Sequence, residues 1–207
     1  MLLALAGLAA LVYWALTLRV GHSWARTGIK GLALLPLVVI ALEQRAPLVA
    51  LALALCSLGD MVLSRPGERA FLGGLVAFAL GHLAWIAVFV WRLGVSAAPL
   101  DLYWPLLAVL AVLIVVMARM LLPRAGALKV PVAVYILVIA AMSVTGVATG
   151  LGWIIAGAML FAASDTLLGL QTFALTHASR AERLANALIW PLYWGAIVLM
   201  TMGALAG

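Results

Sequence analysis

Residues 103–122 read YWPLLAVLAVLIVVMARMLL and carry one charged side chain, Arg119, near the end of the run. About 20 apolar residues in a helix cross the hydrocarbon core of a bilayer, which is about 30 Å thick. A helix is favoured there because it satisfies every backbone polar group within its own segment. This stretch therefore predicts a membrane-spanning helix.

The composition extends this prediction to the whole chain. Of the 207 residues, 68% are hydrophobic and only 9% are charged, which leaves too little polar surface for a water-soluble domain of this size. We expect an all-α, polytopic transmembrane helical bundle that forms one integral membrane domain over residues 1–207. Eight spans are expected near residues 2–18, 29–43, 47–63, 70–91, 103–122, 130–148, 151–171 and 186–205.

The basic residues indicate how these spans are oriented. The gaps before the even-numbered spans hold Arg19, Arg26, Lys30, Arg65, Arg69, Arg119, Arg124, Lys129, Arg180 and Arg183. The other gaps hold only Arg45 and Arg92. Because cytoplasmic loops are enriched in Lys and Arg, we expect eight crossings with both termini outside, in a bacterial inner (plasma) membrane. The net charge of +6 is then explained by orientation, and nucleic acid is not expected as a partner.

The first hydrophobic run is expected to remain in the protein as a permanent span. It has no basic residue ahead of it, and its first cation, Arg19, lies behind it. That order is the reverse of a secretory signal peptide.

Two aspartates interrupt the apolar spans in similar settings, residues 57–61 (SLGDM) and 163–166 (ASDT). An ionised carboxylate in a bilayer costs several kcal/mol unless it has a partner or water, so such residues usually mark sites or pathways. Asp60 and Asp165 lie in the third and seventh spans, each the third in a block of four. A parallel four-helix duplication would give this arrangement. Chance, or convergence of two unrelated spans on the same functional requirement, would give it as well.

Asp60, Asp165 and His82 are the candidate catalytic residues. Two carboxyls in a low-dielectric cleft tend to adopt different protonation states, one acid and one carboxylate, as acid–base chemistry requires. The tight turn at residues 64–69 predicts that the third and fourth spans form an antiparallel hairpin, with Asp60 and His82 lining a cleft that opens toward the cytoplasm. The alternative roles are a buried hydrogen-bonded brace for the aspartates and an interhelical bridge for His82.

Signals for other chemistry are poor. The sequence contains no Gly-x-Ser-x-Gly elbow, HExxH helix, CxxC pair or P-loop. A metal site built from His82, Asp60 and Asp165 would lack the usual paired-histidine spacing, so we expect no metal and no cofactor. The single cysteine, Cys56, excludes an internal disulfide and is expected to be a small packing residue.

Three segments resemble the YhhN-like membrane proteins, the family that includes the lysoplasmalogenases. They are residues 54–63 (ALCSLGDMVL), 71–85 (FLGGLVAFALGHLAW) and 157–165 (GAMLFAASD), to which Tyr135 and Met142 add. The resemblance implies a lysoplasmalogenase-like ether hydrolase that acts on an alkenylglycerophospholipid. Such an enzyme cleaves the vinyl ether of a lysophospholipid to a fatty aldehyde and glycerophosphoethanolamine or glycerophosphocholine.

For this reaction we expect one aspartate to protonate the β carbon of the enol ether while the other stays ionised and activates water. Asp165 is favoured as the acid because it lies deeper in its span, and His82 would orient the pair or relay protons. Lys30 is expected near the substrate phosphate at the cytoplasmic mouth. The other expected substrate contacts are Ser57, Phe78, Tyr135, Ser164 and Tyr193.

Two further functions remain open from the sequence. A proton-coupled transporter of a small molecule or lipid would use the same aspartates, although no span is clearly broken by paired glycines and prolines. A structural or assembly protein would use them only as braces. The sequence leaves open the headgroup preference, the identity of the acid and the oligomeric state.

Overall fold

The computed structural model describes residues 1–17 and 23–206, and every regular element within them is helical, so the predicted all-α class is confirmed. Leu18 and Arg19, expected at the end of the first span and just after it, lie outside the described residues. The chain divides into two compact units, Met1–Val88 and Phe89–Gly207, which are described in turn.

Six helices in the described residues are at least 18 residues long and apolar enough to cross a membrane. Two shorter apolar helices, α1 and α4, accompany them. Together these helices follow the order of the predicted spans. The six longer ones are Trp24–Glu43, Glu68–Leu93, Trp104–Leu121, Gly126–Ala148, Gly152–Phe173 and Arg180–Ala206.

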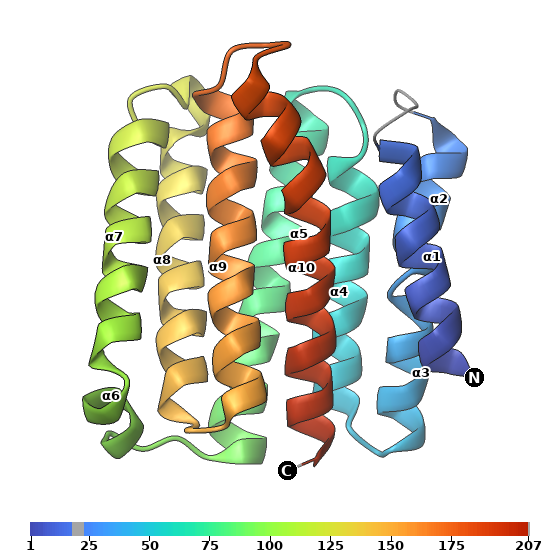
Figure 1. The fold of residues 1–207 in the computed structure, drawn as a ribbon, viewed down its shortest axis with the longest axis vertical. Coiled ribbons are helices and arrows are strands. Elements are labelled where there is room, and N and C mark those ends of the chain that lie inside the picture. Colours follow the sequence, from blue (N-terminus) through green and yellow to red (C-terminus); the bar gives the residue numbers. More distant parts are fainter. Residues whose placement is uncertain (18–22, 207) are drawn as a thin grey trace. The chain divides into compact units, whose positions relative to one another are not determined.

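The first unit is built around α4. Its elements are α1 (Leu2–Thr17), α2 (Trp24–Leu32), α3 (Leu35–Glu43), α4 (Pro47–Leu63) and α5 (Glu68–Ala87). Helices α2 and α3 form one interrupted span, and consecutive spans of the unit run in opposite directions (Figure 1). Helix α4 packs against α2, α3 and most extensively α5, so its inner face is the best buried of the unit.

The second span begins at Trp24, five residues before the expected start. Ser23 caps it, because the Ser23 Oγ accepts a 3.1 Å hydrogen bond from the backbone N–H of Arg26. The span is interrupted at residues 33–34 because Pro36, the second residue of α3, has no N–H to continue the helical hydrogen bonds. Local capping and proline chemistry therefore decide the shape of this span.

The second unit is built around α9. A π-helical turn, η1 (Val88–Leu93), follows α5 directly. Helix α9 packs against α7, α8 and most extensively α10. The remaining elements are α6 (Ala98–Leu102), α7 (Trp104–Leu121), η2 (Gly126–Leu128), α8 (Lys129–Ala148), α9 (Gly152–Phe173) and α10 (Arg180–Ala206).

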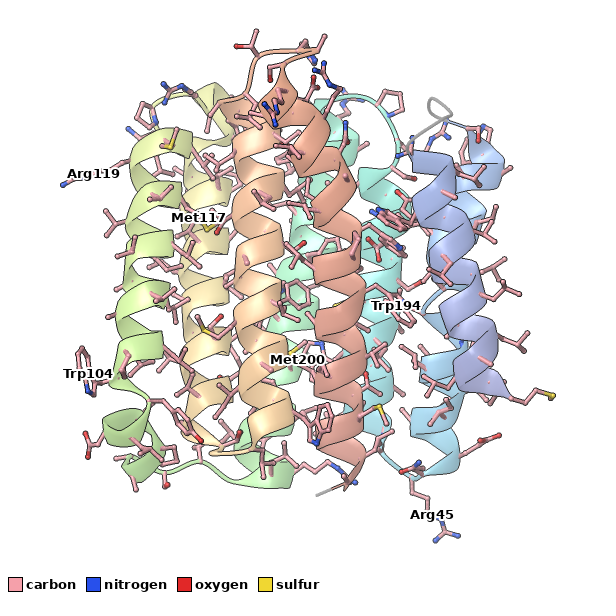
Figure 2. All side chains as sticks on the ribbon, in the orientation of Figure 1. Arg45, Trp104, Met117, Arg119, Trp194 and Met200 are labelled. Atoms are coloured by element: carbon pink, nitrogen blue, oxygen red, sulfur yellow. The ribbon has the colours of Figure 1, made fainter. Side chains whose placement is uncertain are left out.

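Side chains at the two ends of α7 fit a helix that crosses a bilayer. Trp104 is 66% exposed at the start of α7, and the exposed Arg119 lies near the other end (Figure 2). Tryptophan and arginine are favoured where a span meets the membrane–water interface. Met117 of α7 and Met200 of α10 are buried, in contrast to these two exposed side chains.

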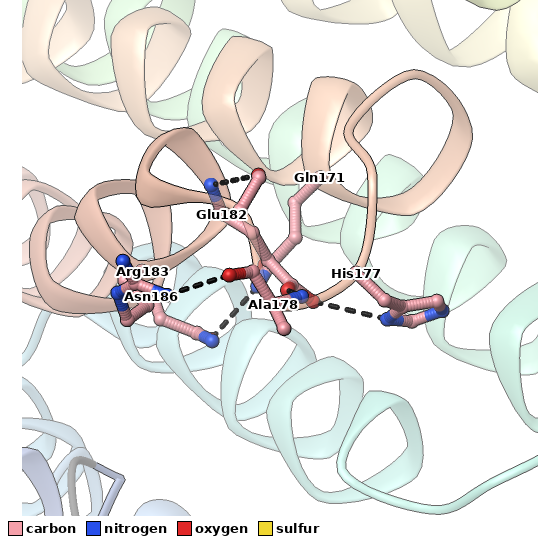
Figure 3. A network of polar contacts seen from close by, with 7 residues as sticks. Gln171, His177, Ala178, Glu182, Arg183 and Asn186 are labelled. Carbon is pink, nitrogen blue, oxygen red and sulfur yellow. Dashed lines mark hydrogen bonds and ion pairs between the residues drawn. The ribbon is translucent and has the colours of Figure 1, made fainter.

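The α9–α10 turn explains why α10 begins at Arg180, six residues earlier than expected. The Ser179 Oγ accepts a 3.1 Å hydrogen bond from the backbone N–H of Glu182. The Glu182 carboxylate in turn accepts the backbone N–H of Ala178 and lies 3.2 Å from Nδ1 of His177 (Figure 3). The Ser179 hydroxyl satisfies one donor that the first helical turn leaves open, and the Glu182 carboxylate holds the residue just before this cap, so the helix extends into the polar connection.

The second and third spans of the two units have similar lengths and positions along the chain. Helices α2 and α3 together cover 20 residues, Trp24–Glu43, and α8 alone also covers 20, Lys129–Ala148, although the second unit's span is 23 residues long when η2 is included. Their first residues differ by 105 in number, and so do Pro47 and Gly152, the first residues of α4 and α9. In both units this third span packs against the second and the fourth span.

Candidate functional site

The α4–α5 hairpin positions Asp60 in the first unit. Asp60 is 1% exposed, and the two helices meet closely around it because small residues face larger ones. A Cβ on Gly59 would lie 2.5 Å from the Phe78 ring, and one on Gly81 would lie 2.9 Å from Sγ of Cys56. The predicted antiparallel hairpin is therefore confirmed, with Cys56 buried in its packing.

Asp60 forms an ion pair with Lys30 of α2. The distance from Lys30 Nζ to Asp60 Oδ1 is 2.7 Å, and the two side chains are only 15% and 2% exposed. Lys30 Nζ also lies 5.8 Å from the centre of the Tyr13 ring of α1. Lys30, expected near the substrate phosphate, thus contacts the carboxylate. The ammonium provides the partner that an anion in a membrane span requires.

Ser57 lies one helical turn before Asp60 and ties α4 to α2. Its hydroxyl donates a 3.2 Å hydrogen bond to the backbone carbonyl of Gly31. We call Asp60, Lys30, Tyr13 and Ser57 the Asp60 site. Three spans meet there, which is why its members come from distant parts of the sequence.

His82 lies on α5 and is completely buried. Its Nδ1 is 2.6 Å from the backbone carbonyl of Phe78, and a carbonyl accepts only from a protonated nitrogen. In the neutral ring this bond leaves Nε2 as the acceptor. Because Gly81 lies opposite Cys56, His82 is about five residues, roughly 7.5 Å along the axis, from the level of Asp60.

Asp165 is buried in the second unit, where it is 6% exposed. The hydroxyl of Tyr135 on α8 donates a 2.8 Å hydrogen bond to Asp165 Oδ2. The next residue, Thr166, donates to the carbonyl of Ala162 in its own helix at 2.7 Å. Asp165 and Tyr135 form the Asp165 site, which holds its carboxyl with an uncharged donor.

Ser164 and Tyr193, expected to contact substrate, both connect α9 with α10. The Ser164 hydroxyl donates a 3.0 Å hydrogen bond to the carbonyl of Ile189. Tyr193 is 4% exposed, and its ring meets Phe161 edge-on at 5.3 Å and lies 5.6 Å from Trp190. These contacts hold together the helix that carries Asp165.

The two aspartates occupy matching positions. Asp60 is the fourteenth residue of α4, and Asp165 is the fourteenth residue of α9. Lys30 is the seventh residue of α2 and Tyr135 is the seventh residue of α8, and each lies 30 residues before its aspartate. The pairing is not among the expectations from sequence, although the equal spacing of 30 residues is visible there.

Within residues 1–17 and 23–206, no group of three or more His, Cys, Asp and Glu side chains is arranged to hold a metal ion. The groups in the two sites that can take part in acid–base chemistry are the carboxyls. One carboxyl is paired with a cation, and the other is hydrogen-bonded to a phenol.

Comparison with known proteins matches this chain to one family. The profile of the YhhN family matches residues 23–204. The lysoplasmalogenase of Mycobacterium tuberculosis (strain CDC 1551 / Oshkosh) is 36% identical over 164 residues, which are 75% of this chain and 59% of that protein. Human lysoplasmalogenase TMEM86B is 36% identical over 160 residues, 74% of this chain and 62% of that protein. The chain thus spans about three fifths of these relatives, and no solved structure matches it.

Proposed function

The chain belongs to the YhhN family, and from this premise we propose that it is a membrane-embedded hydrolase that cleaves the vinyl ether bond of a lysoplasmalogen. The products would be a fatty aldehyde and glycerophosphoethanolamine or glycerophosphocholine. The proposal is supported by the named lysoplasmalogenases that share 36% identity with the chain. The observation that carries the chemistry is a pair of buried aspartates on apolar helices, each with its own polar partner.

The proposed enzyme crosses a bacterial inner membrane eight times. Helices α1 and α4, with 16 and 17 residues, are about 25 Å long and cover most of a hydrocarbon core of about 30 Å. In the first unit Arg65 and Arg69 follow α4, and in the second unit Arg180 and Arg183 follow α9. By the positive-inside rule these connections face the cytoplasm, and the start of α1 and the end of α10 face outside.

The reaction begins with transfer of a proton to the β carbon of the vinyl ether, which leaves an oxocarbenium ion. Water then adds to the α carbon and gives up a proton, and the hemiacetal collapses to the aldehyde and the glycerol hydroxyl. Asp165 is the proposed proton donor, because it is buried on an apolar helix, where the ionised form of a carboxyl is costly, and it accepts the hydrogen bond of the Tyr135 hydroxyl. Asp60 is the proposed base for the attacking water, because Lys30 keeps it ionised.

His82 is the proposed proton relay of this reaction. Its Nδ1 is occupied by the Phe78 carbonyl, which leaves Nε2 as the basic atom. Four other side chains remain proposed substrate contacts, and each also takes part in packing or hydrogen bonding between helices. Variants at these positions therefore need both turnover and stability measurements. They are Ser57, Phe78, Ser164 and Tyr193.

The test is aldehyde release by purified protein in detergent. Lysoplasmalogen should be cleaved, while the matched lysophospholipid with a saturated ether should not, because it has no double bond to protonate. Asp60→Asn and Asp165→Asn should each lower turnover by about 100-fold or more. Asp101→Asn, at an exposed position on the short helix α6, is the control and should retain activity.

Three outcomes would contradict the proposal. Substantial activity in a folded Asp60→Asn or Asp165→Asn protein would remove the aspartates from the mechanism. A double variant much less active than either single one would show that the two carboxyls act separately. Activity that appears only across a sealed bilayer would indicate a transporter. A chelator should leave turnover unchanged, because the proposed chemistry uses no metal.

A further inference from the structure

We propose that Arg65, held against the indole of Trp24, binds the phosphate of the lysolipid headgroup and so sets the distance between that phosphate and Asp60. The identity of the ligand rests on the proposed function. The site itself is built from contacts between α2 and α4, which both belong to the first unit. Lys30, the cation expected near the phosphate, is engaged with Asp60.

A series of contacts between α2 and α4 places Arg65 on the same side of α4 as Asp60. Partners that come earlier in α2 meet partners that come later in α4, as in antiparallel helices. Both side chains therefore face α2. The contacts, in order, are Lys30–Asp60 at 2.7 Å, Thr27–Ser64 at 2.7 Å between the hydroxyls, and Trp24–Arg65 at 3.6 Å from the guanidinium carbon to the ring centre.

The stack on Trp24 uses only the flat face of the Arg65 guanidinium. The N–H groups of a guanidinium project in its plane, around the rim. Nη1 of Arg65 is buried and has no hydrogen-bond partner among residues 1–17 and 23–206. A buried donor without an acceptor is costly, so this nitrogen indicates a ligand that brings acceptor oxygens. Phosphate oxygens accept from arginine in this in-plane geometry.

The charge at this end of the unit also favours an anion. Within the Lys30–Asp60 pair the two charges offset each other. Arg65 adds a positive charge, and so does Arg26, which lies one helical turn before Lys30 in α2. Their field attracts a phosphodiester, which is an anion. Arg69 adds a further charge but is exposed, so it serves as a matched control.

The spacing of the two ends matches the proposed substrate. Arg65 follows Asp60 by five residues, and the N–H groups of Ser64 and Arg65 still bond to carbonyls of the last turn of α4, so the two levels differ by about 7.5 Å. Their partners on α2, Lys30 and Trp24, are six residues apart, or about 9 Å. In a lysoplasmalogen, six bonds of about 1.5 Å join the α carbon of the vinyl ether to the phosphorus, and they extend over roughly 7–8 Å. A phosphate at Arg65 would therefore place the vinyl ether at the level of Asp60.

The first test measures binding without turnover. The ligand is the lysophospholipid with a saturated ether, which keeps the phosphate and is not cleaved. In purified protein, Arg65→Gln should weaken its binding by about tenfold, because a charge-assisted hydrogen bond to the phosphate is lost. Arg69→Gln removes the same charge from an exposed position in the first turn of α5 and should change binding by less than about twofold. Equal binding by wild type and Arg65→Gln would overturn the proposal.

A ligand without phosphate separates recognition from packing. The matched saturated alkylglycerol has the same chain and glycerol, so wild type and Arg65→Gln should bind it equally. Loss of both ligands by the same factor would show a packing defect and would overturn the phosphate role. Inorganic phosphate has no chain and should not displace the lysolipid at the concentration at which the lysolipid binds. Displacement at that concentration would assign the site to a free anion and would also overturn the proposal.

Replacing Trp24 tests the stack. Trp24→Leu should weaken binding of the lysophospholipid by about threefold to fivefold, since Arg65 keeps its charge but loses the surface that orients it. Trp24→Phe keeps an aromatic face and should restore most of the affinity. Neither variant should change the binding of the alkylglycerol. Wild-type affinity for the lysophospholipid in Trp24→Leu would overturn the positioning role of Trp24.

Aldehyde release gives an independent measurement. Arg65→Gln should raise KM for lysoplasmalogen by about tenfold while kcat stays within about threefold of wild type, because the phosphate contact is the same in the ground state and the transition state. Asp60→Asn should instead lower kcat. A fall in kcat with an unchanged KM in Arg65→Gln would overturn the binding role of Arg65.

These measurements separate the two proposals. If wild-type protein releases no aldehyde from lysoplasmalogen, the proposed function fails, while binding of the saturated-ether lysophospholipid and its loss in Arg65→Gln still decide the phosphate site. If aldehyde is released and Arg65→Gln binds and cleaves the lysolipid as wild type does, the phosphate site fails and the proposed function stands.

Discussion

The ring of Phe78 lies against Gly59 so closely that a Cβ at position 59 would come within 2.5 Å of it. Gly59 directly precedes Asp60, and the backbone carbonyl of Phe78 is bonded to the His82 ring. The contact therefore fixes the spacing of α4 and α5 at the level of the Asp60 site. The position of the carboxyl depends on an apolar contact next to it.

Replacing Gly59 should destabilise the hairpin. We expect Gly59→Ala to lower the free energy of unfolding by about 1–3 kcal/mol, because a buried aromatic ring has to move. Gly28→Ala is the matched control. No atom lies within 4 Å of a Cβ there, so alanine should raise stability by about 0.5–1 kcal/mol. Thermal unfolding in detergent measures both, and equal stability of the two variants would contradict the prediction.

Replacing His82 should separate proton relay from packing. In His82→Asn the side-chain amide can still donate to the Phe78 carbonyl, as Nδ1 does at 2.6 Å, but the basic Nε2 is lost. We expect kcat to fall by about 10- to 100-fold while the unfolding temperature stays close to wild type. His82→Phe also loses the hydrogen bond and should fall in stability as well. Wild-type turnover in a stable His82→Asn protein would leave His82 with a structural role only.

Replacing Ser164 should loosen the contact between α9 and α10. Its hydroxyl is bonded to the Ile189 carbonyl of the neighbouring helix, so Ser164→Ala should cost about 1 kcal/mol of stability. Thr172→Ala is the control, because the Thr172 hydroxyl is exposed and bonds to Leu168 in its own helix. Its effect should stay below about 0.5 kcal/mol. An unfolding measurement that finds no difference between the two would argue against the brace.

Replacing Ser179 should destabilise the start of α10 without changing the chemistry. Ser179→Ala removes the acceptor of the Glu182 N–H and should cost about 1 kcal/mol. Aldehyde release per folded molecule should be unchanged, because the α9–α10 turn lies outside both aspartate sites. Arg180→Ala, at an exposed neighbouring position, is the control for stability. A selective loss of turnover in Ser179→Ala would implicate this turn in the reaction.

The helix boundaries show which parts of the fold the local sequence predicts correctly. The predicted span at residues 47–63 coincides with α4, because a proline starts it and the polar Ser64 follows it. The second and last spans begin earlier than their apolar residues do, at Trp24 and Arg180. There a capping serine, and not hydrophobicity, decides the first turn.

The all-α membrane class, the order of the apolar helices and the choice of Asp60 and Asp165 as candidate residues can all be predicted from the sequence. These features depend on hydrophobic length and on the cost of a carboxyl in apolar surroundings, which are properties of short segments. The partners of the aspartates were decided only by the tertiary structure. Lys30 and Tyr135 lie 30 residues away, and only the packing of the second span against the third turns them toward the carboxyls. Such packing depends on which side chains face each other, and a linear pattern of apolar residues does not specify this.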